Sequence, residues 1–199
     1  MRFLKLIDLL TPYFCIFFLS LFIYKFGIND LEDYSHGLLT ARIYWENLGN
    51  LFISYYDYYG PGVRLPIGNA PFFHPLNFLL YDLKLYYTFF VAIHLLIQFL
   101  YTKKIFLILK IEHKNFILGI ILIFCLPNLN YIISDDWIGA FFSYCLFPSI
   151  FYYTIKIINK QKFSDYYKIT LLTVFWIING HSGIIATYII FLFSYFLIS

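Results

Sequence analysis

The sequence predicts an all-α protein: a polytopic transmembrane helical bundle of about five to six spans. Its long first outer loop is predicted to carry an interfacial amphipathic helix. Hydrophobic residues make up 61% of the 199 residues, and charged residues only 13%. Apolar runs recur at lengths that can cross a hydrocarbon core of about 30 Å. We therefore interpret residues 1–199 as a single membrane domain.

Six apolar segments are the predicted spans. They cover residues 6–26, 85–108, 116–133, 137–155, 166–179 and 184–199. The segment 27–84 is the one long stretch that is not continuously apolar, and we interpret it as the outer loop. Because the sequence ends inside an apolar run, we expect these residues to be the N-terminal part of a longer chain. A short complete product is the alternative.

The basic residues predict the orientation of the spans. Ten of the fourteen lysines and arginines lie before the first span, around the turn between the second and third spans, or around the turn between the fourth and fifth spans. Loop 27–84 instead holds six of the eleven acidic residues, and Asp135 and Asp136 fall on the same lysine-poor side. Cytoplasmic loops are enriched in lysine and arginine, so the N-terminus is predicted to be cytoplasmic and loop 27–84 extracytoplasmic. The positive residues form no single patch, which argues against nucleic acid as a partner.

The three cysteines are interpreted as small buried hydrophobic residues. Cys15, Cys125 and Cys145 all lie within apolar runs. Their spacing indicates neither a metal site nor a disulfide framework.

The first half of the outer loop, from Ser35 to about Tyr56, has the periodicity of an amphipathic helix. Apolar residues recur at three- and four-residue steps at Leu38, Ala41, Trp45, Leu48 and Phe52. Arg42, Glu46 and Asn50 fall on the opposite face. A helix of this kind directly after a membrane span is expected to lie in the interface plane.

The second half of the loop, from Gly60 to Leu80, is rich in glycine and proline. This density excludes a regular helix and predicts an extended, turn-rich segment. Arg64 is the one charged residue in this segment. It is a candidate phosphate-binding residue, with a solvated or snorkelling arginine as the alternative.

Asp30, Glu32 and Asp33 form an acidic cluster directly after the first span. As structure, they fit the expected topology and can cap the following helix. As chemistry, a carboxylate at the membrane surface can act as a general base toward an acceptor hydroxyl, and partial burial would raise its pKa. We take Asp33 and Asp30 as the candidate catalytic residues. The cluster also suits a divalent cation, although no ligand spacing specifies one.

Two further polar elements fall on the same side of the predicted membrane. Asp135 and Asp136 are adjacent carboxylates at a predicted helix end, and the alternative is that they only mark topology. His181 lies between glycines at the end of the fifth span and is a candidate for ligand contact or for packing. All three are candidate substrate-binding residues, together with Arg64. His94 and Gln98 are the polar residues inside the second span.

The run from Arg64 to Leu80, RLPIGNAPFFHPLNFLL, resembles the end of the first outer loop in YfhO-like bacterial polytopic membrane proteins of the GT-C glycosyltransferase type. The likeness includes the step Phe73 to Asn77. It also includes Gly180-His181-Ser182, followed at similar spacing by Tyr188, although the family usually has a proline after this histidine. Asp33 is the best-placed match to the family's acidic residue after the first span.

The resemblance implies a GT-C-like bundle in the bacterial cytoplasmic membrane with its site on the outer face. It implies that a sugar moves from a polyprenyl-phosphate carrier to an envelope glycan or lipid acceptor. The family's base corresponds to Asp33, and its second outer acidic position corresponds to Asp135 or Asp136. Two rival hypotheses are a transporter or flippase component for envelope lipids, and a non-catalytic membrane assembly protein.

Overall fold

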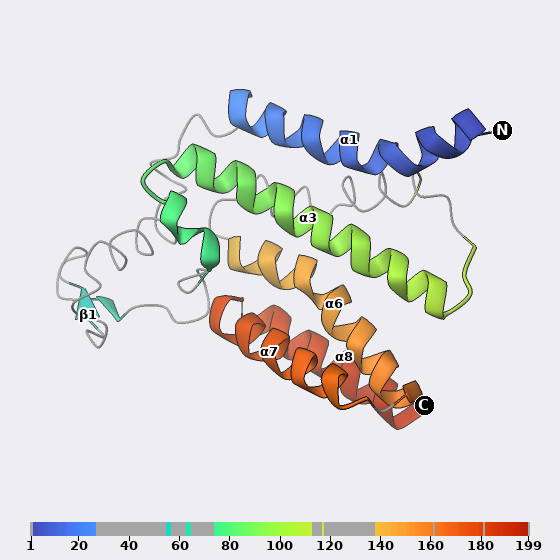
Figure 1. The fold of residues 1–199 in the computed structure, drawn as a ribbon. Helices are drawn as coiled ribbons and strands as arrows, with labels where there is room; N and C mark the ends of the chain where they lie inside the picture. Colours follow the sequence, from blue (N-terminus) through green and yellow to red (C-terminus); the bar gives the residue numbers. More distant parts are fainter. Residues whose placement is uncertain are drawn as a thin grey trace.

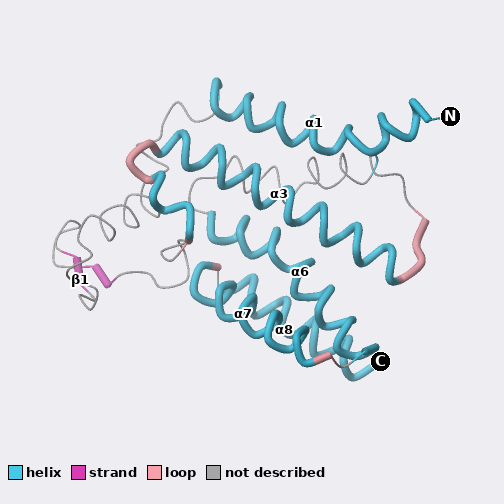
Figure 2. Tube along the Cα trace, viewed as in Figure 1, coloured by secondary structure: helices cyan, strands magenta, loops and turns pink. Residues whose placement is uncertain are grey.

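The fold is that of a computed structural model. The structure describes residues 2–26, 55–56, 63–64, 74–112, 117, 138–160, 162–180 and 182–198. Five α-helices contain most of these residues (Figures 1 and 2). They are α1 (Arg2–Phe26), α3 (Leu83–Ile108), α6 (Ile138–Lys160), α7 (Phe163–Asn179) and α8 (Ser182–Ile198). The all-α prediction is therefore confirmed for the part of the chain that the structure describes.

The described residues of the outer loop contribute short elements. Strands β1 (Tyr55–Tyr56) and β2 (Val63–Arg64) pair antiparallel, with Tyr55 opposite Arg64. The 3-10 helix η3 (Pro75–Leu79) precedes α3. The helix predicted from Ser35 to about Tyr56 is thus wrong for its last two residues, because their backbone groups pair with a second strand. The rest of that predicted helix lies outside the described residues.

The described helices run in two opposite directions (Figure 1). Helices α1 and α7 run one way, and α3, α6 and α8 run the other way. Helix α3 packs against α1 and α6, and α6 packs against α7 and α8. Helices α3 and α6 are thus parallel neighbours, separated in the sequence by the interval from Ile108 to Ile138. The third predicted span, 116–133, falls in this interval and lies outside the described residues except for Ile117.

The two ends of the bundle differ in charge. The lysine-rich end contains the last turns of α3 and α6 and the first turns of α7. Its described lysines include Lys103, Lys104, Lys110, Lys156, Lys160, Lys162 and Lys168. The lysine-poor end contains the last turns of α1 and α7 and the first turns of α3 and α6.

Two described helices are long and apolar enough to cross a membrane, over Lys84–Ile108 and Ile138–Asn159. Shorter apolar helices cover Leu6–Phe22 and Gly183–Leu197. Helices α1 and α8 also expose large apolar side chains. Phe18 is 63% exposed and Ile190 is 67% exposed. Surfaces of this kind are costly in water and favourable against lipid.

Helix boundaries differ from the predicted spans mainly at the basic turn after the fourth span. Helix α6 continues past 155 to Lys160, and α7 already begins at Phe163. Near the end of α6, Lys156 points to α7, where its Nζ lies 3.0 Å from Asp165 Oδ1. A part-buried ion pair therefore lies beside the basic turn that follows the fourth predicted span.

Side-chain caps fix the entry of the chain into α3. The ring Nδ1 of His74 accepts a hydrogen bond from the Leu76 amide at 3.2 Å, at the start of η3, and Pro75 occupies the first helical position. Asp82 then caps α3 by accepting a hydrogen bond from the Leu85 amide at 2.9 Å. Both caps satisfy amides that have no partner within a helix.

The core lies where α3 meets α6. Phe90 and Val91 of α3 and Ala140 and Phe142 of α6 are fully buried. Cys145 is buried and free, as predicted, and its Sγ lies 3.6 Å from Gln98 Oε1. Lipid tails are as apolar as these side chains, so close packing and interhelical polar contacts hold such an interface together.

Candidate functional site

A buried polar cluster lies at the lysine-poor end of the bundle, around His74 and His94. His74 is 4% exposed and His94 is 1% exposed, and their ring centroids lie 5.0 Å apart. The His74 ring also contacts Phe90 of α3, Phe142 of α6 and Phe175 of α7, at centroid distances of 4.9, 5.9 and 5.7 Å. This one ring therefore joins η3 to three helices.

The hydrogen bonds of the two histidines fix complementary tautomers. His94 Nδ1 lies 2.6 Å from the Phe90 carbonyl oxygen, so Nδ1–H donates and Nε2 is left as an acceptor. His74 Nδ1 accepts from the Leu76 amide, so the proton of the neutral ring is on Nε2. Burial, and to a lesser extent the neighbouring His94, lower the pKa of His74 to about 2. His74 is therefore neutral and is suited to hydrogen bonding, not to neutralising a phosphate.

Described residues of two stretches, Arg64 to Leu80 and Gly180 to Ser182, lie at this end of the bundle. His74 and Asn77 belong to the first stretch, and Asn179 and Gly180 belong to or adjoin the second; all four are buried. Gly180 approaches α6 so closely that a Cβ there would lie 2.3 Å from Ser143 Oγ. Trp176 fixes the same contact by donating a hydrogen bond from Nε1 to the Ser143 carbonyl at 3.1 Å. His74 approaches α7 through Phe175, one helical turn before Asn179.

An apolar groove of 520 Å³ lies between α1 and α3 in the same half of the bundle. Its lining consists of aliphatic and aromatic side chains, together with one serine and one threonine. They are Tyr13, Ile16, Phe17, Ser20, Leu21 and Tyr24 of α1, and Leu85, Thr88, Phe89, Ala92, Ile93 and Leu96 of α3. Ser20 and Thr88 donate to the carbonyls of Ile16 and Lys84 on their own helices, at 2.8 Å each. The groove therefore suits hydrocarbon.

Lys84 places a positive charge at the lysine-poor end of this groove. Its Nζ lies 5.1 Å from the centroid of the Tyr24 ring, across the gap between α3 and α1. The sequence did not indicate Lys84 as a site residue, nor did it indicate the groove. Neither feature had a sequence signal, because an apolar groove has the composition of any lipid-facing helix pair.

The predicted site residues lie almost entirely outside the part of the chain that the structure describes. Asp30, Asp33, Asp135, Asp136 and His181 lie outside the described residues. Arg64 lies in β2, where its backbone pairs with Tyr55, and its side chain is outside the description. These assignments therefore stay predictions. The described ranges contain no group of three histidine, cysteine or acidic residues that could hold a metal ion.

Comparison of the chain with protein-family models, with curated proteins and with solved structures found no match. The geometry of the described residues and the motif resemblance are therefore the grounds for a functional proposal.

Proposed function

We propose that this chain is a GT-C-like integral membrane glycosyltransferase. It moves a sugar from a polyprenyl-phosphate carrier to a cell-envelope acceptor on the outer face of the membrane. The observation that carries the proposal is the apolar groove between α1 and α3, with Lys84 at its lysine-poor end. An amphiphile with a long hydrocarbon chain and an anionic head matches both features.

The membrane setting is supported by the surface and the directions of the helices. Two helices are long and apolar enough to span, and the exposed apolar side chains of α1 and α8 extend the lipid-facing surface. The directions of α3, α6 and α7 place most of the described lysines at one end of the bundle. On this basis the bundle has five to six spans, and the positive-inside rule assigns the groove and loop 27–84 to the outer side.

The groove supports a carrier lipid as the donor. Its volume of 520 Å³ falls within the range of ligand sites, about 300–1,000 Å³. The hydroxyls of Ser20 and Thr88 are already bonded to their own helix backbones, so these two groups offer a polar ligand little to bind. The isoprenoid chain occupies the groove, and Lys84 attracts the carrier phosphate.

The proposed chemistry is a single inverting displacement. Asp33, assisted by Asp30, removes the proton of the acceptor hydroxyl. The acceptor oxygen then bonds to the anomeric carbon while the bond from that carbon to the phosphate oxygen breaks. The electron pair leaves with the carrier phosphate, which Arg64, Lys84 and His181 stabilise. Asp135 and Asp136 bind substrate hydroxyls, and the neutral His74–His94 pair packs behind the site.

Sugar transfer from a lipid-linked donor by the purified protein in liposomes tests this function. The variants D33N and D30N should lower the rate by at least 100-fold, because a missing general base costs about 10²–10⁴-fold. The control E112Q makes the same chemical change at the lysine-rich end, where Glu112 is exposed, and should leave the rate unchanged. Full transfer by D33N and D30N proteins that insert normally would refute the assignment.

A transporter or flippase component for envelope lipids is the second candidate. The observation that favours it is the burial of His94 and Gln98 in the interior of the bundle, at 1% and 2% exposure. Polar groups inside membrane spans are costly and mark transport pathways. Lipid translocation across liposomes that is lost in H94F and Q98L, and kept in D33N, would favour this function over glycosyl transfer. A non-catalytic assembly role is the outcome if neither activity is present.

A further inference from the structure

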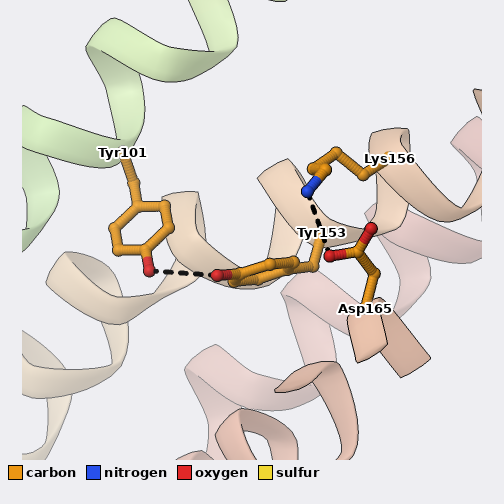
Figure 3. Close-up of polar contacts among 4 residues, drawn as sticks. All are labelled: Tyr101, Tyr153, Lys156 and Asp165. Atoms are coloured by element: carbon orange, nitrogen blue, oxygen red, sulfur yellow. Dashed lines mark hydrogen bonds and ion pairs between the residues drawn. The ribbon is translucent and has the colours of Figure 1, made fainter. Parts of the chain in front are cut away.

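The lysine-rich end carries a cluster of cationic and phenolic side chains that the proposed transfer reaction does not use. We name it the lysine–tyrosine cluster. Its members are Tyr101 and Lys104 of α3, Tyr152, Tyr153 and Lys156 of α6, and Asp165 and Lys168 of α7. Figure 3 shows four of them: Tyr101 and Tyr153 point toward each other from α3 and α6, and Lys156 points to Asp165.

Three ammonium groups gather around three phenol rings in this cluster. Lys104 Nζ lies 4.3 Å from the Tyr101 centroid and 5.6 Å from the Tyr152 centroid. Lys156 Nζ lies 5.6 Å from Tyr152, and Lys168 Nζ lies 5.8 Å from Tyr153. The hydroxyls of Tyr101 and Tyr153 are 3.5 Å apart. The three lysines come from three different helices, and the faces of the tyrosine rings hold their ammonium groups in place.

The cluster has an excess of positive charge. Its carboxylate, Asp165, is 1% exposed and is paired with Lys156 at 3.0 Å. Lys104 and Lys168 have no ion-pair partner within the part of the chain that the structure describes. With three lysines and one aspartate, the cluster carries a net charge of +2, and it has two neighbouring hydroxyls of which one donates to the other and leaves the second free to donate to a ligand. This is the chemistry that binds a phosphate group.

An exposed apolar side chain lies beside the cluster. Leu171 lies on α7 one turn beyond Lys168, toward the middle of the bundle, and is 52% exposed. In a membrane this side chain contacts acyl chains. A ligand that uses both the cationic groups and the apolar neighbour is an amphiphile with an anionic head, which argues for a lipid and against free phosphate.

We propose that the lysine–tyrosine cluster binds the phosphate head group of an anionic phospholipid. Lys104 and Lys168 contact the phosphate oxygens, one hydroxyl of the hydrogen-bonded Tyr101–Tyr153 pair donates to them, and the acyl chains pack on Leu171. This site goes beyond the proposed transfer reaction, because it lies at the opposite end of the bundle from the groove.

Lipid binding by the purified protein in detergent tests the proposal. Native mass spectrometry would measure the occupancy of added phosphatidylglycerol, with phosphatidylcholine as the neutral comparison and inorganic phosphate as the soluble competitor. The double variant K104Q/K168Q removes the two cluster charges. The matched control K110N/K162Q removes two exposed charges from the same end, and asparagine suits position 110 because Lys110 has φ 56°.

The expected result is at least tenfold preference for phosphatidylglycerol over phosphatidylcholine. K104Q/K168Q should lower phosphatidylglycerol affinity at least tenfold, and K110N/K162Q less than threefold. Equal losses in the two variants would overturn the proposal in favour of general electrostatic attraction. It would also be overturned if the protein had no preference for the anionic lipid, or if millimolar inorganic phosphate displaced the lipid. None of these outcomes depends on sugar transfer.

Discussion

His74 and His94 lie with their ring centroids 5.0 Å apart in the interior of the bundle, although one begins a 3-10 turn and the other belongs to α3. The Nδ1 atom of each ring forms a hydrogen bond with the backbone of its own segment. His74 Nδ1 is the acceptor, and His94 Nδ1 is the donor. The pair is therefore neutral. Its packing holds the end of the outer loop against α3, α6 and α7.

The burial of His74 predicts a loss of stability in acid. The folded-state pKa of His74 is about 2 against 6.5 ordinarily, so below pH 6.5 the unfolded chain takes up a proton that the folded chain excludes. Between pH 7.5 and 5.5 this costs about 1.4 kcal/mol of unfolding free energy. Denaturant unfolding in detergent micelles should show that H74N, which keeps a side-chain cap, loses that much less than wild type. Equal losses would contradict the assignment of a neutral His74.

Gly180 should not tolerate a side chain. An alanine Cβ there would lie 2.3 Å from Ser143 Oγ and 2.6 Å from the Trp176 carbonyl oxygen, and the second atom is backbone that cannot rotate away. We expect G180A to lower the free energy of unfolding by about 1–3 kcal/mol. Gly183 is the matched control: it is exposed in α8, so G183A should be neutral or stabilise by up to about 1 kcal/mol. Similar unfolding curves for G180A and wild type would refute the close α6–α7 contact.

How far the sequence predicts this structure depends on the length of each pattern. Hydrophobic length alone places the helices that begin near residues 85 and 138, because a long apolar run has few alternatives. It does not predict that α6 continues to Lys160, since a lysine that pairs with a buried aspartate looks like any solvated lysine. The meeting of His74 with Phe175, and the groove beside Lys84, depend on tertiary packing that no local pattern encodes.

The Lys156–Asp165 pair should be more sensitive to the loss of one partner than to the loss of both. Asp165 is 1% exposed, and its Oδ2 has no hydrogen-bond partner within the described ranges, so Lys156 is its main compensation. K156M should lower the free energy of unfolding by about 3–5 kcal/mol, because it leaves a buried charge unpaired. K156M/D165L should recover most of this loss, measured by a double-mutant cycle in micelles. A double variant as unstable as K156M would argue that packing, not charge, is responsible.

Filling the groove should block the carrier lipid without unfolding the protein. Ala92 lines the groove from α3, so A92F should occupy part of its 520 Å³ and abolish saturable binding of polyprenyl phosphate. K84Q should weaken the same binding about tenfold, because it removes the charge that faces the carrier phosphate. Filter binding of a radiolabelled carrier in micelles measures both. Unchanged affinity in A92F would exclude the groove as the carrier site.

The most direct test of the account is the location of the two bundle ends relative to the membrane. Single cysteines would replace Tyr81, 70% exposed before α3, or Lys162, exposed between α6 and α7, after Cys15, Cys125 and Cys145 are changed to serine. A membrane-impermeant maleimide should label Y81C in intact cells, and K162C only after permeabilisation. Labelling of both positions in intact cells, or of neither until permeabilisation, would contradict the proposed orientation, in which the bundle spans the membrane and the half that contains the groove faces the outside.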